Sequence, residues 1–233
     1  MHPFSMPKQF VERVVARSGR VHPFDVLNPA RTALLVIDMQ NYFVKPGFLG
    51  AVPMAREIVP SINRLAAELR SRGGHVVWVK NSTSGTLESW SVLNDCLMTP
   101  KRRDLRYGTM DESHEGHKIW SAMDTRPEDA QIVKKRYSAF IQGSSDIEAH
   151  LRERNIDTVL IVGTATNICC ESTARDAMML NFKTVMISDA LATYTDQEHH
   201  AALSNFYVTF GDIQTVNEAI ASLDTFSAQV KKP

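Results

Sequence analysis

Cysteine is scarce in this chain of 233 residues, and its pattern excludes a disulfide-stabilised fold. There are three cysteines, Cys96, Cys169 and Cys170, and two of them are adjacent. An odd number with this spacing forms no disulfide framework, so we expect the protein to work in a reducing compartment, the cytoplasm. No apolar run approaches the roughly 20 residues of a membrane span. The first ten residues also lack the apolar segment of a secretion signal, so we expect none.

An excess of charge of either sign is also absent. Lys and Arg together number 26, and so do Asp and Glu. A basic surface for nucleic acid or for a membrane is therefore not expected, and the partner we predict is a small molecule. Internal repeats and low-complexity segments are missing too. With 43% hydrophobic residues, the chain suits one large domain.

We divide the chain into an N-terminal arm of residues 1–30, with one short helix, and a domain of residues 31–233. In the domain, apolar runs that suit buried strands alternate with segments of helical spacing. The strands are expected at 32–38, 75–80, 131–135, 158–163, 184–189 and, weakly, 213–216; the helices are expected at 55–72, 146–154, 169–181, 196–206 and 216–226. This alternation predicts an α/β fold with a parallel sheet covered on both faces. Residues 81–130 are predicted to form a long irregular loop, which is typical of a segment that covers a site.

Three reactive residues fall at or near the carboxyl ends of predicted strands, where open parallel sheets bind their ligands. They are Asp38, Lys134 and Cys169. Taken singly, each has an ordinary alternative: a turn cap for the acid, a solvated charge for the lysine, and a small buried apolar residue for the cysteine. Taken together, they fit a cysteine nucleophile with a base and a cation.

The predicted position of Cys169 at a helix N-terminus favours a lowered thiol pKa, because the unsatisfied N–H groups there stabilise an anion. Asp38 would accept the thiol proton and Lys134 would stabilise the thiolate. Backbone N–H groups of Ala165 and Cys169 would receive the oxyanion of a tetrahedral intermediate. Cys170 lies one residue further along the helix and points elsewhere, at about 100° from Cys169.

Three motifs resemble those of the isochorismatase-like cysteine hydrolase family. They are DMQNYF at 38–43, KKRYSAF at 134–140 and GTATNICCESTARDA at 163–177, in the order of that family. The resemblance implies a three-layer α/β/α fold with a six-stranded, mainly parallel sheet. It also implies a catalytic triad of Asp38, Lys134 and Cys169, a cis peptide bond at Thr164–Ala165, and a homodimer or homotetramer.

The residues also favour one branch of this family. Isochorismatases proper lack the nucleophilic cysteine. Nicotinamidases carry a metal motif with histidines soon after the second strand, where this chain reads VKNSTSGTLESW with no histidine. His114 and His117 have no third ligand at a clear spacing, so a solvated loop is the better interpretation and we predict neither a metal nor a cofactor.

The sequences of residues 136–140 (RYSAF) and 165–173 (ATNICCEST), with Asn81 after the second strand, are similar to those of the ureidoacrylate amidohydrolase branch. Hydrolases of biuret, triuret and N-carbamoylsarcosine are close in pattern. The resemblance implies a cysteine amidohydrolase that cleaves a C–N bond of a small ureido, carbamoyl or amide compound and releases ammonia or a carbamate. The alternatives are a vinyl-ether hydrolase of the isochorismatase type, a nicotinamidase-like amidase, and a non-catalytic redox role for the cysteine pair.

Six residues near the triad are candidates for substrate contacts: Gln40, Asn41, Phe43, Asn81, Arg136 and Tyr137. The first three follow Asp38 and should face the mouth of the pocket. Arg136 has two interpretations, a bidentate partner for a substrate carboxylate or a structural ion pair.

Overall fold

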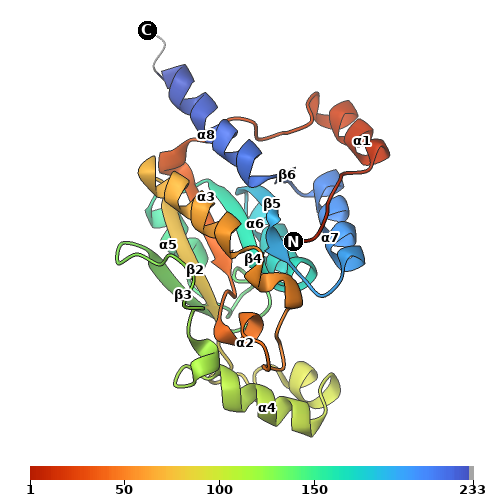
Figure 1. The fold of residues 1–233 in the computed structure, drawn as a ribbon, viewed down its shortest axis with the longest axis vertical. Coiled ribbons are helices and arrows are strands. Elements are labelled where there is room, and N and C mark those ends of the chain that lie inside the picture. The colour runs from red at the N-terminus through yellow and green to blue at the C-terminus, as the bar shows by residue number, and fades with distance from the viewer. Residues whose placement is uncertain (231–233) are drawn as a thin grey trace.

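Six strands form one sheet in the order β3-β2-β1-β4-β5-β6, and every neighbouring pair is parallel (Figure 1). This computed structural model describes residues 1–230. The strands are β1 (Thr32–Ile37), β2 (His75–Asn81), β3 (Ala130–Lys134), β4 (Thr158–Thr164), β5 (Lys183–Ala192) and β6 (Asp212–Gln214). The predicted α/β fold with a six-stranded parallel sheet is confirmed.

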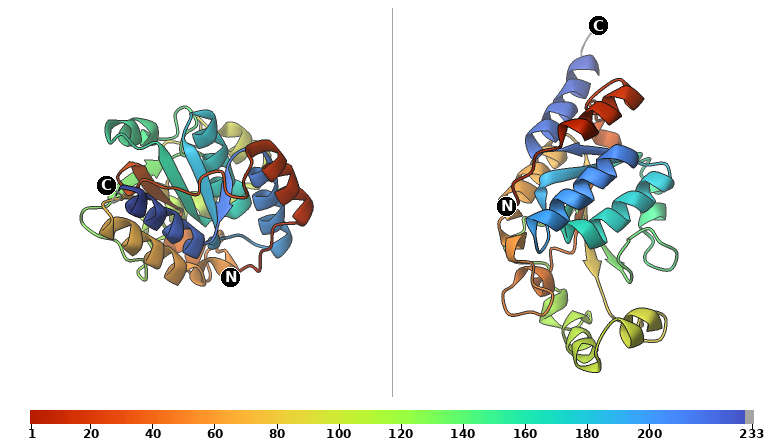
Figure 2. Two further views of the ribbon diagram at one scale, coloured as in Figure 1. Left: turned by 90° about the horizontal axis from the view of Figure 1, so that it is seen from above. Right: turned by 90° about the vertical axis from the view of Figure 1, so that its right-hand side faces the viewer.

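The strands are buried on both faces, and this is why they appear in the sequence as continuous apolar runs. Along β1, Leu34 and Val36 face one apolar layer, whereas Leu35 and Ile37 face the other. The first layer is closed by α3 (Val59–Ser71) and α8 (Val216–Val230), and the second by α5 (Ile147–Glu153), α6 (Glu171–Met179) and α7 (Asp196–Thr209). Figure 2 shows the sheet between these two layers of helices.

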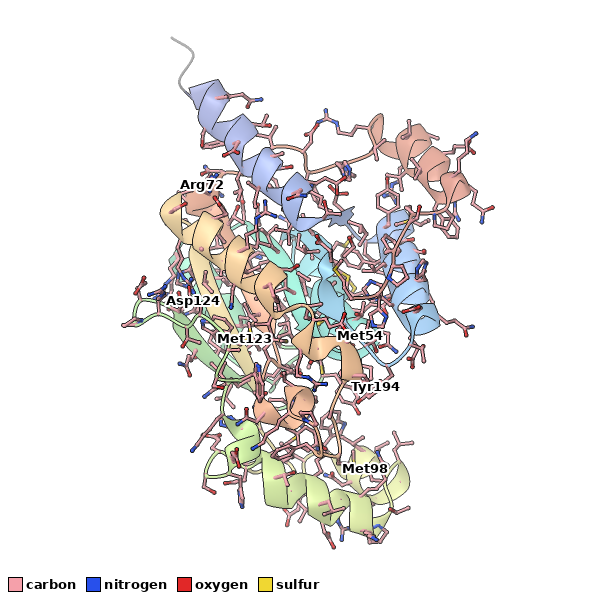
Figure 3. The ribbon with its side chains drawn as sticks, viewed as in Figure 1. Met54, Arg72, Met98, Met123, Asp124 and Tyr194 are labelled. Atoms are coloured by element: carbon pink, nitrogen blue, oxygen red, sulfur yellow. The ribbon has the colours of Figure 1, made fainter. Side chains whose placement is uncertain are left out.

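A salt bridge joins the two helices of the first layer. Arg72, labelled in Figure 3, follows the last residue of α3. Its Nη2 lies 2.9 Å from Asp224 Oδ1 on α8. The pair is partly exposed, so its contribution to stability is small. The apolar side chains beneath it account for most of the packing between α3 and α8.

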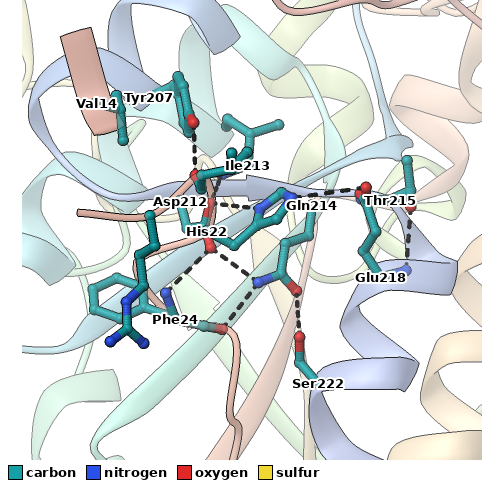
Figure 4. Close-up of polar contacts among 12 residues, drawn as sticks. Val14, His22, Phe24, Tyr207, Asp212, Ile213, Gln214, Thr215, Glu218 and Ser222 are labelled. Carbon is teal, nitrogen blue, oxygen red and sulfur yellow. Dashed lines mark hydrogen bonds and ion pairs between the residues drawn. The ribbon is translucent and has the colours of Figure 1, made fainter. Parts of the chain in front are cut away.

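The N-terminal arm contains the predicted helix as α1 (Lys8–Ser18), which packs against α7 of the same chain. The arm then reaches the start of β6 (Figure 4). There the buried carboxylate of Asp212 lies 3.1 Å from His22 Nδ1 and accepts a hydrogen bond from Gln214 Nε2. Gln214 Nε2 also donates to Phe24 O at 3.0 Å. These contacts fix the arm to the edge of the sheet.

The expectation of an irregular segment from 81 to 130 is wrong in part, because an 11-residue helix, α4 (Pro100–Met110), lies within it. Only Arg106 and Met110 are buried along α4, so it lacks the apolar stripe that identifies most helices. A capping signal is nevertheless present: the Thr99 side chain accepts a hydrogen bond from Arg102 N, and Pro100 occupies the first helical position.

Short helical turns complete the chain: η1 (Pro29–Arg31), α2 (Asn41–Val44), η2 (Pro53–Arg56), η3 (Val92–Cys96), η4 (Glu115–His117) and η5 (Thr166–Cys170). The predicted helix at 55–72 begins later, at Val59, because η2 precedes it. Within residues 1–230, no helix combines the length and apolarity that a bilayer crossing requires.

Gly163, near the end of β4, is required by close backbone approach. Its φ is +110°, and a β-carbon at this position would collide with the carbonyl oxygen of Ile37 on β1. A side chain here would force apart β1 and β4, the two central strands that precede Asp38 and the Cys169 turn.

We predict that Gly163→Ala lowers the free energy of unfolding by at least about 2 kcal/mol, because strain at positive φ and the collision with Ile37 add together. Urea denaturation followed by circular dichroism measures the change. Gly143→Ala is the matched control, since Gly143 also has a positive φ, +76°, but has no atom within 4 Å of a β-carbon. Equal losses in the two variants would contradict the collision.

Candidate active site

The structure brings Asp38, Lys134 and Cys169 together at the carboxyl edge of the sheet. Asp38 directly follows β1, Lys134 is the last residue of β3, and Cys169 lies in η5 after β4. Strand β2 separates β3 from β1, and the long lysine side chain spans that distance. Lys134 Nζ lies 2.9 Å from Asp38 Oδ2, and neither side chain is exposed to solvent.

The backbone around this ion pair is held in place by hydrogen bonds. Asp38 adopts a left-handed conformation with φ +55°, and its N–H donates to Val79 O at 2.9 Å. The Thr164 hydroxyl donates to Asp38 O at 3.3 Å. Besides its ion pair with Asp38, Lys134 Nζ donates a hydrogen bond to Arg136 O at 3.1 Å. Asp38 therefore turns out of its strand in a defined direction, with the lysine fixed against it.

Burial and mutual attraction set the ionisation of the pair. Burial raises the pKa of Asp38, and the Lys134 charge opposes this only in part. Burial is the largest single influence on Lys134 and lowers its pKa, but the charges of Asp38 and Cys169 and the hydrogen bonds to them together outweigh it, so the lysine pKa is raised. Asp38 therefore takes up a proton more readily than an exposed aspartate, while Lys134 stays charged.

The expectation of a lowered pKa for Cys169 is wrong. Burial, followed by the nearby Asp38 charge, raises the pKa of this thiol to about 12, and Lys134 offsets only part of the increase. The sulfur also sits in the π-helical turn η5, and α6 begins only at Glu171, so the helix effect does not dominate. The resting thiol is therefore protonated. Cys170 is buried in the core, as predicted, with its sulfur 4.0 Å from Val162 O.

Cys169 forms part of the wall of a cavity of about 190 Å³, which is smaller than the ~300–1,000 Å³ of sites for drug-sized ligands. The lining comes from both the sheet edge and the segment that contains α4: Tyr42, Phe43, Leu49, Gly50, Asn81, Met98, Arg102, Arg106, Tyr137, Ala165, Ile168, Cys169 and Tyr194. Figure 3 labels two of them, Met98 just before α4 and Tyr194 after β5. The cavity suits a small molecule with apolar, aromatic and polar contacts.

Three of the six predicted contact residues line this cavity: Phe43, Asn81 and Tyr137. Asn81 is the most informative of them. Its side chain is almost completely buried, and its Oδ1 has no hydrogen-bond partner among the described residues. An unpaired acceptor in a cavity wall is available for an N–H group of a ligand.

The other three, Gln40, Asn41 and Arg136, do not line the cavity, because their polar groups are used within the protein. Gln40 Nε2 donates to Asn81 O and to His117 O, and its Oε1 accepts from Asn81 N at 2.7 Å. Gln40 therefore ties the end of β2 to η4.

Asn41 and Arg136 likewise hold the loops around the cavity. Asn41 Nδ2 donates to Glu115 O at 2.9 Å. Arg136 Nη2 donates to Ser89 O at 2.8 Å, and its guanidinium lies 5.1 Å from the centre of the Trp90 ring. The sequence allows two interpretations of Arg136, a partner for a substrate carboxylate or a member of a structural ion pair. Neither interpretation describes these contacts with Ser89 O and the Trp90 ring.

Sequence reasoning missed the two arginines and two of the tyrosines that line the cavity: Tyr42, Arg102, Arg106 and Tyr194. The arginines were missed because the sequence did not predict helix α4, which carries both of them. The available signal was the spacing of four residues between them after the Thr99–Pro100 cap, which places both on one face of a helix. No three His, Cys, Asp or Glu side chains within residues 1–230 are grouped as ligands for a metal ion.

The family model described as an isochorismatase domain matches residues 32–218. The chain belongs to the isochorismatase family, and it is a hydrolase. The cis peptide bond that the resemblance implies is present at Thr164–Ala165.

Two curated relatives and one solved structure illustrate the similarity. The uncharacterized isochorismatase family protein YecD of Escherichia coli O157:H7 is 31% identical over 84% of this chain and 98% of its own length. The ureidoacrylate amidohydrolase RutB of Caulobacter vibrioides is 30% identical over 84% of this chain and 92% of its own length. The crystal structure of a cysteine hydrolase from Pseudomonas syringae pv. phaseolicola 1448A superposes with a TM-score of 0.77 at 26% identity, covering 86% of this chain and 95% of that one.

We predict that Cys169 remains a thiol up to at least pH 9.5, since its pKa is raised to about 12. Thiolate absorbance at 240 nm, measured as the difference between the wild type and Cys169→Ala, reports its ionisation. Asp38→Asn should move this titration to lower pH, because the carboxylate raises the thiol pKa and Lys134 lowers it. A wild-type midpoint near the ordinary value of about 8.5 would contradict the prediction.

Proposed function

We propose that this hydrolase cleaves a C–N bond of a small ureido, carbamoyl or amide compound through a covalent intermediate on Cys169. One observation carries the proposal: a completely buried Asp38–Lys134 ion pair lies within hydrogen-bonding reach of Cys169, which lines a small cavity. The similarity to a relative named ureidoacrylate amidohydrolase supports C–N cleavage, and the relative named cysteine hydrolase supports the nucleophile.

In the first step, Asp38 takes the proton from the Cys169 thiol while the sulfur attacks the carbonyl carbon. The raised pKa of Asp38 makes it a stronger base than an exposed aspartate, and this suits the removal of a proton from a thiol of high pKa. Lys134 keeps its positive charge throughout, so it stabilises the negative charge that moves from the carboxylate to the sulfur. The backbone N–H groups of Ala165 and Cys169, both in the cavity wall, receive the oxyanion.

In the second step, the C–N bond breaks and Asp38 returns its proton to the leaving nitrogen. Ammonia or an amine leaves, and the acyl or carbamoyl group stays on sulfur as a thioester-like intermediate, which hydrolysis later releases as a carboxylate or a carbamate. Water then gives a proton to Asp38 and attacks the acyl carbon, and the sulfur regains the proton as it departs. Each proton that Asp38 accepts is returned, so the residue is unchanged after one turnover.

The alternatives differ in what they require of the sulfur. Vinyl-ether hydrolysis of the isochorismatase type needs no nucleophilic cysteine, and a redox role of the cysteine pair needs no acyl intermediate. Cys170 is buried in the core and does not line the cavity, which leaves Cys169 as the one member of the pair placed to meet a small molecule.

We predict that Cys169→Ala and Cys169→Ser each reduce kcat by at least ~10³-fold, because removal of a nucleophile leaves only binding and oxyanion stabilisation. The assay is ammonia release from ureidoacrylate, biuret, triuret, N-carbamoyl amino acids, nicotinamide and maleamate. Cys96→Ser is the matched control, since Cys96 is exposed and lies outside the cavity.

Intact-mass spectra after an acid quench separate the alternatives. An acyl or carbamoyl adduct on the wild type that is absent from Cys169→Ala supports the covalent route. Full ammonia release by Cys169→Ala would overturn the covalent route. Sulfenic or disulfide adducts alone, without turnover on any of these compounds, would point to a redox role.

A further inference from the structure

Arg106 is a buried cation without a hydrogen-bond or ion-pair partner in the part of the chain that the structure describes. Its side chain is only 6% exposed. Its Nη1 donates to no protein atom, and no carboxylate of residues 1–230 lies within ion-pair distance of its guanidinium. Burial of an unpaired charge is costly, so proteins rarely retain one unless something else compensates it.

The helix that carries Arg106 presents a second cation to the same cavity. Arg102 and Arg106 are four residues apart on α4, so they lie on one face of the helix, and both line the cavity. Like charges at this spacing destabilise a helix in isolation. Arg102 is exposed to solvent, whereas Arg106 is buried, with its Cζ 6.0 Å from the centre of the Trp90 ring.

The charges around the cavity leave a positive excess. Asp38 and Lys134 neutralise each other at 2.9 Å. No Asp or Glu is among the residues that line the cavity, and both charged side chains in its lining are arginines. An anion in the cavity would remove this excess and would satisfy the free donor of Arg106.

The unpaired polar atoms of Arg106 and Asn81 also indicate which donor and acceptor groups a ligand carries. Arg106 offers N–H donors, and Asn81 Oδ1 offers an acceptor, in the same cavity of about 190 Å³. A ligand that fits both has an acceptor group at one end and an N–H group at the other. A carboxylate matches the planar fork of a guanidinium, and the N–H of an amide or ureide matches Asn81.

We propose that Arg106 binds a carboxylate of the substrate, so that the enzyme selects ureido or amide acids over neutral amides of the same size. The proposal deepens the function given above and rests on it for the chemistry at Cys169. Arg106 contacts the end of the substrate away from the reacting bond. It therefore determines specificity and leaves the acyl transfer itself to the three residues at the sheet edge.

The first test compares an acid with its neutral analogue, N-carbamoyl-β-alanine and N-carbamoyl-β-alaninamide. Arg106→Gln should lower kcat/KM for the acid roughly 10- to 100-fold, mainly through KM, and leave the neutral compound within about twofold. Arg106→Lys should restore part of the loss. Arg103→Gln is the control on the same helix, because Arg103 pairs with Asp95 and Asp104 and does not line the cavity.

The second test does not depend on turnover. Cys169 is alkylated in a Cys96→Ser background with iodoacetate and 3-bromopropionate, and with iodoacetamide and 3-bromopropionamide, and the adducts are followed by intact mass. Arg106→Gln should slow at least one of the two acids roughly 10- to 100-fold while both amides keep their rates. Thermal unfolding of each variant shows that the fold is retained.

The two tests distinguish the failure of this proposal from that of the proposed function. If Arg106→Gln changes the rates for the acids and the amides by the same factor, the acid-to-amide ratio stays constant. That result would overturn the role of Arg106. Undiminished activity of Cys169→Ala would overturn the covalent mechanism, and the acid-to-amide ratio would still report on Arg106.

Discussion

The ion pair between Asp38 and Lys134 is the interaction on which the rest of this site depends. Two opposite charges lie 2.9 Å apart with no exposure to solvent. Each would be strongly destabilising without the other, and together they are tolerable because the attraction offsets the loss of hydration. The pair also connects the ends of β1 and β3 across β2, so the charge that a cysteine mechanism requires is fixed by the sheet itself.

This pair also affects the ionisation of Cys169, and so the way in which the proposed mechanism activates it. A helix N-terminus would give a standing thiolate, which is open to oxidation. Here burial and the Asp38 carboxylate keep the Cys169 thiol protonated, with a pKa of about 12. In the mechanism that we propose, activation accompanies the attack on a substrate, when Asp38 removes the proton. A reactive sulfur that appears only in the presence of substrate is less exposed to side reactions.

The site divides into two parts with different origins. The sheet edge supplies the three residues of the proposed mechanism, and the segment between β2 and β3 supplies the cavity wall that contains Arg106. Gln40 joins these parts, since its amide binds Asn81 at the end of β2 and His117 O in η4. In this arrangement the charge and shape of the cavity depend on α4, whereas the ion pair depends on the sheet edge.

The sequence by itself determined the fold class, the six strands and the three residues at their ends, because buried parallel strands are continuous apolar runs and their carboxyl ends meet at one edge. The tertiary structure alone decided the rest. It placed α4 and its arginines, since a mostly exposed helix has no apolar period to detect. It assigned Gln40, Asn41 and Arg136 to loop contacts, because hydrogen-bond partners distant in sequence used their polar groups. It raised the pKa of Cys169, because desolvation depends on every segment packed around the sulfur, and a local pattern of residues does not contain that information.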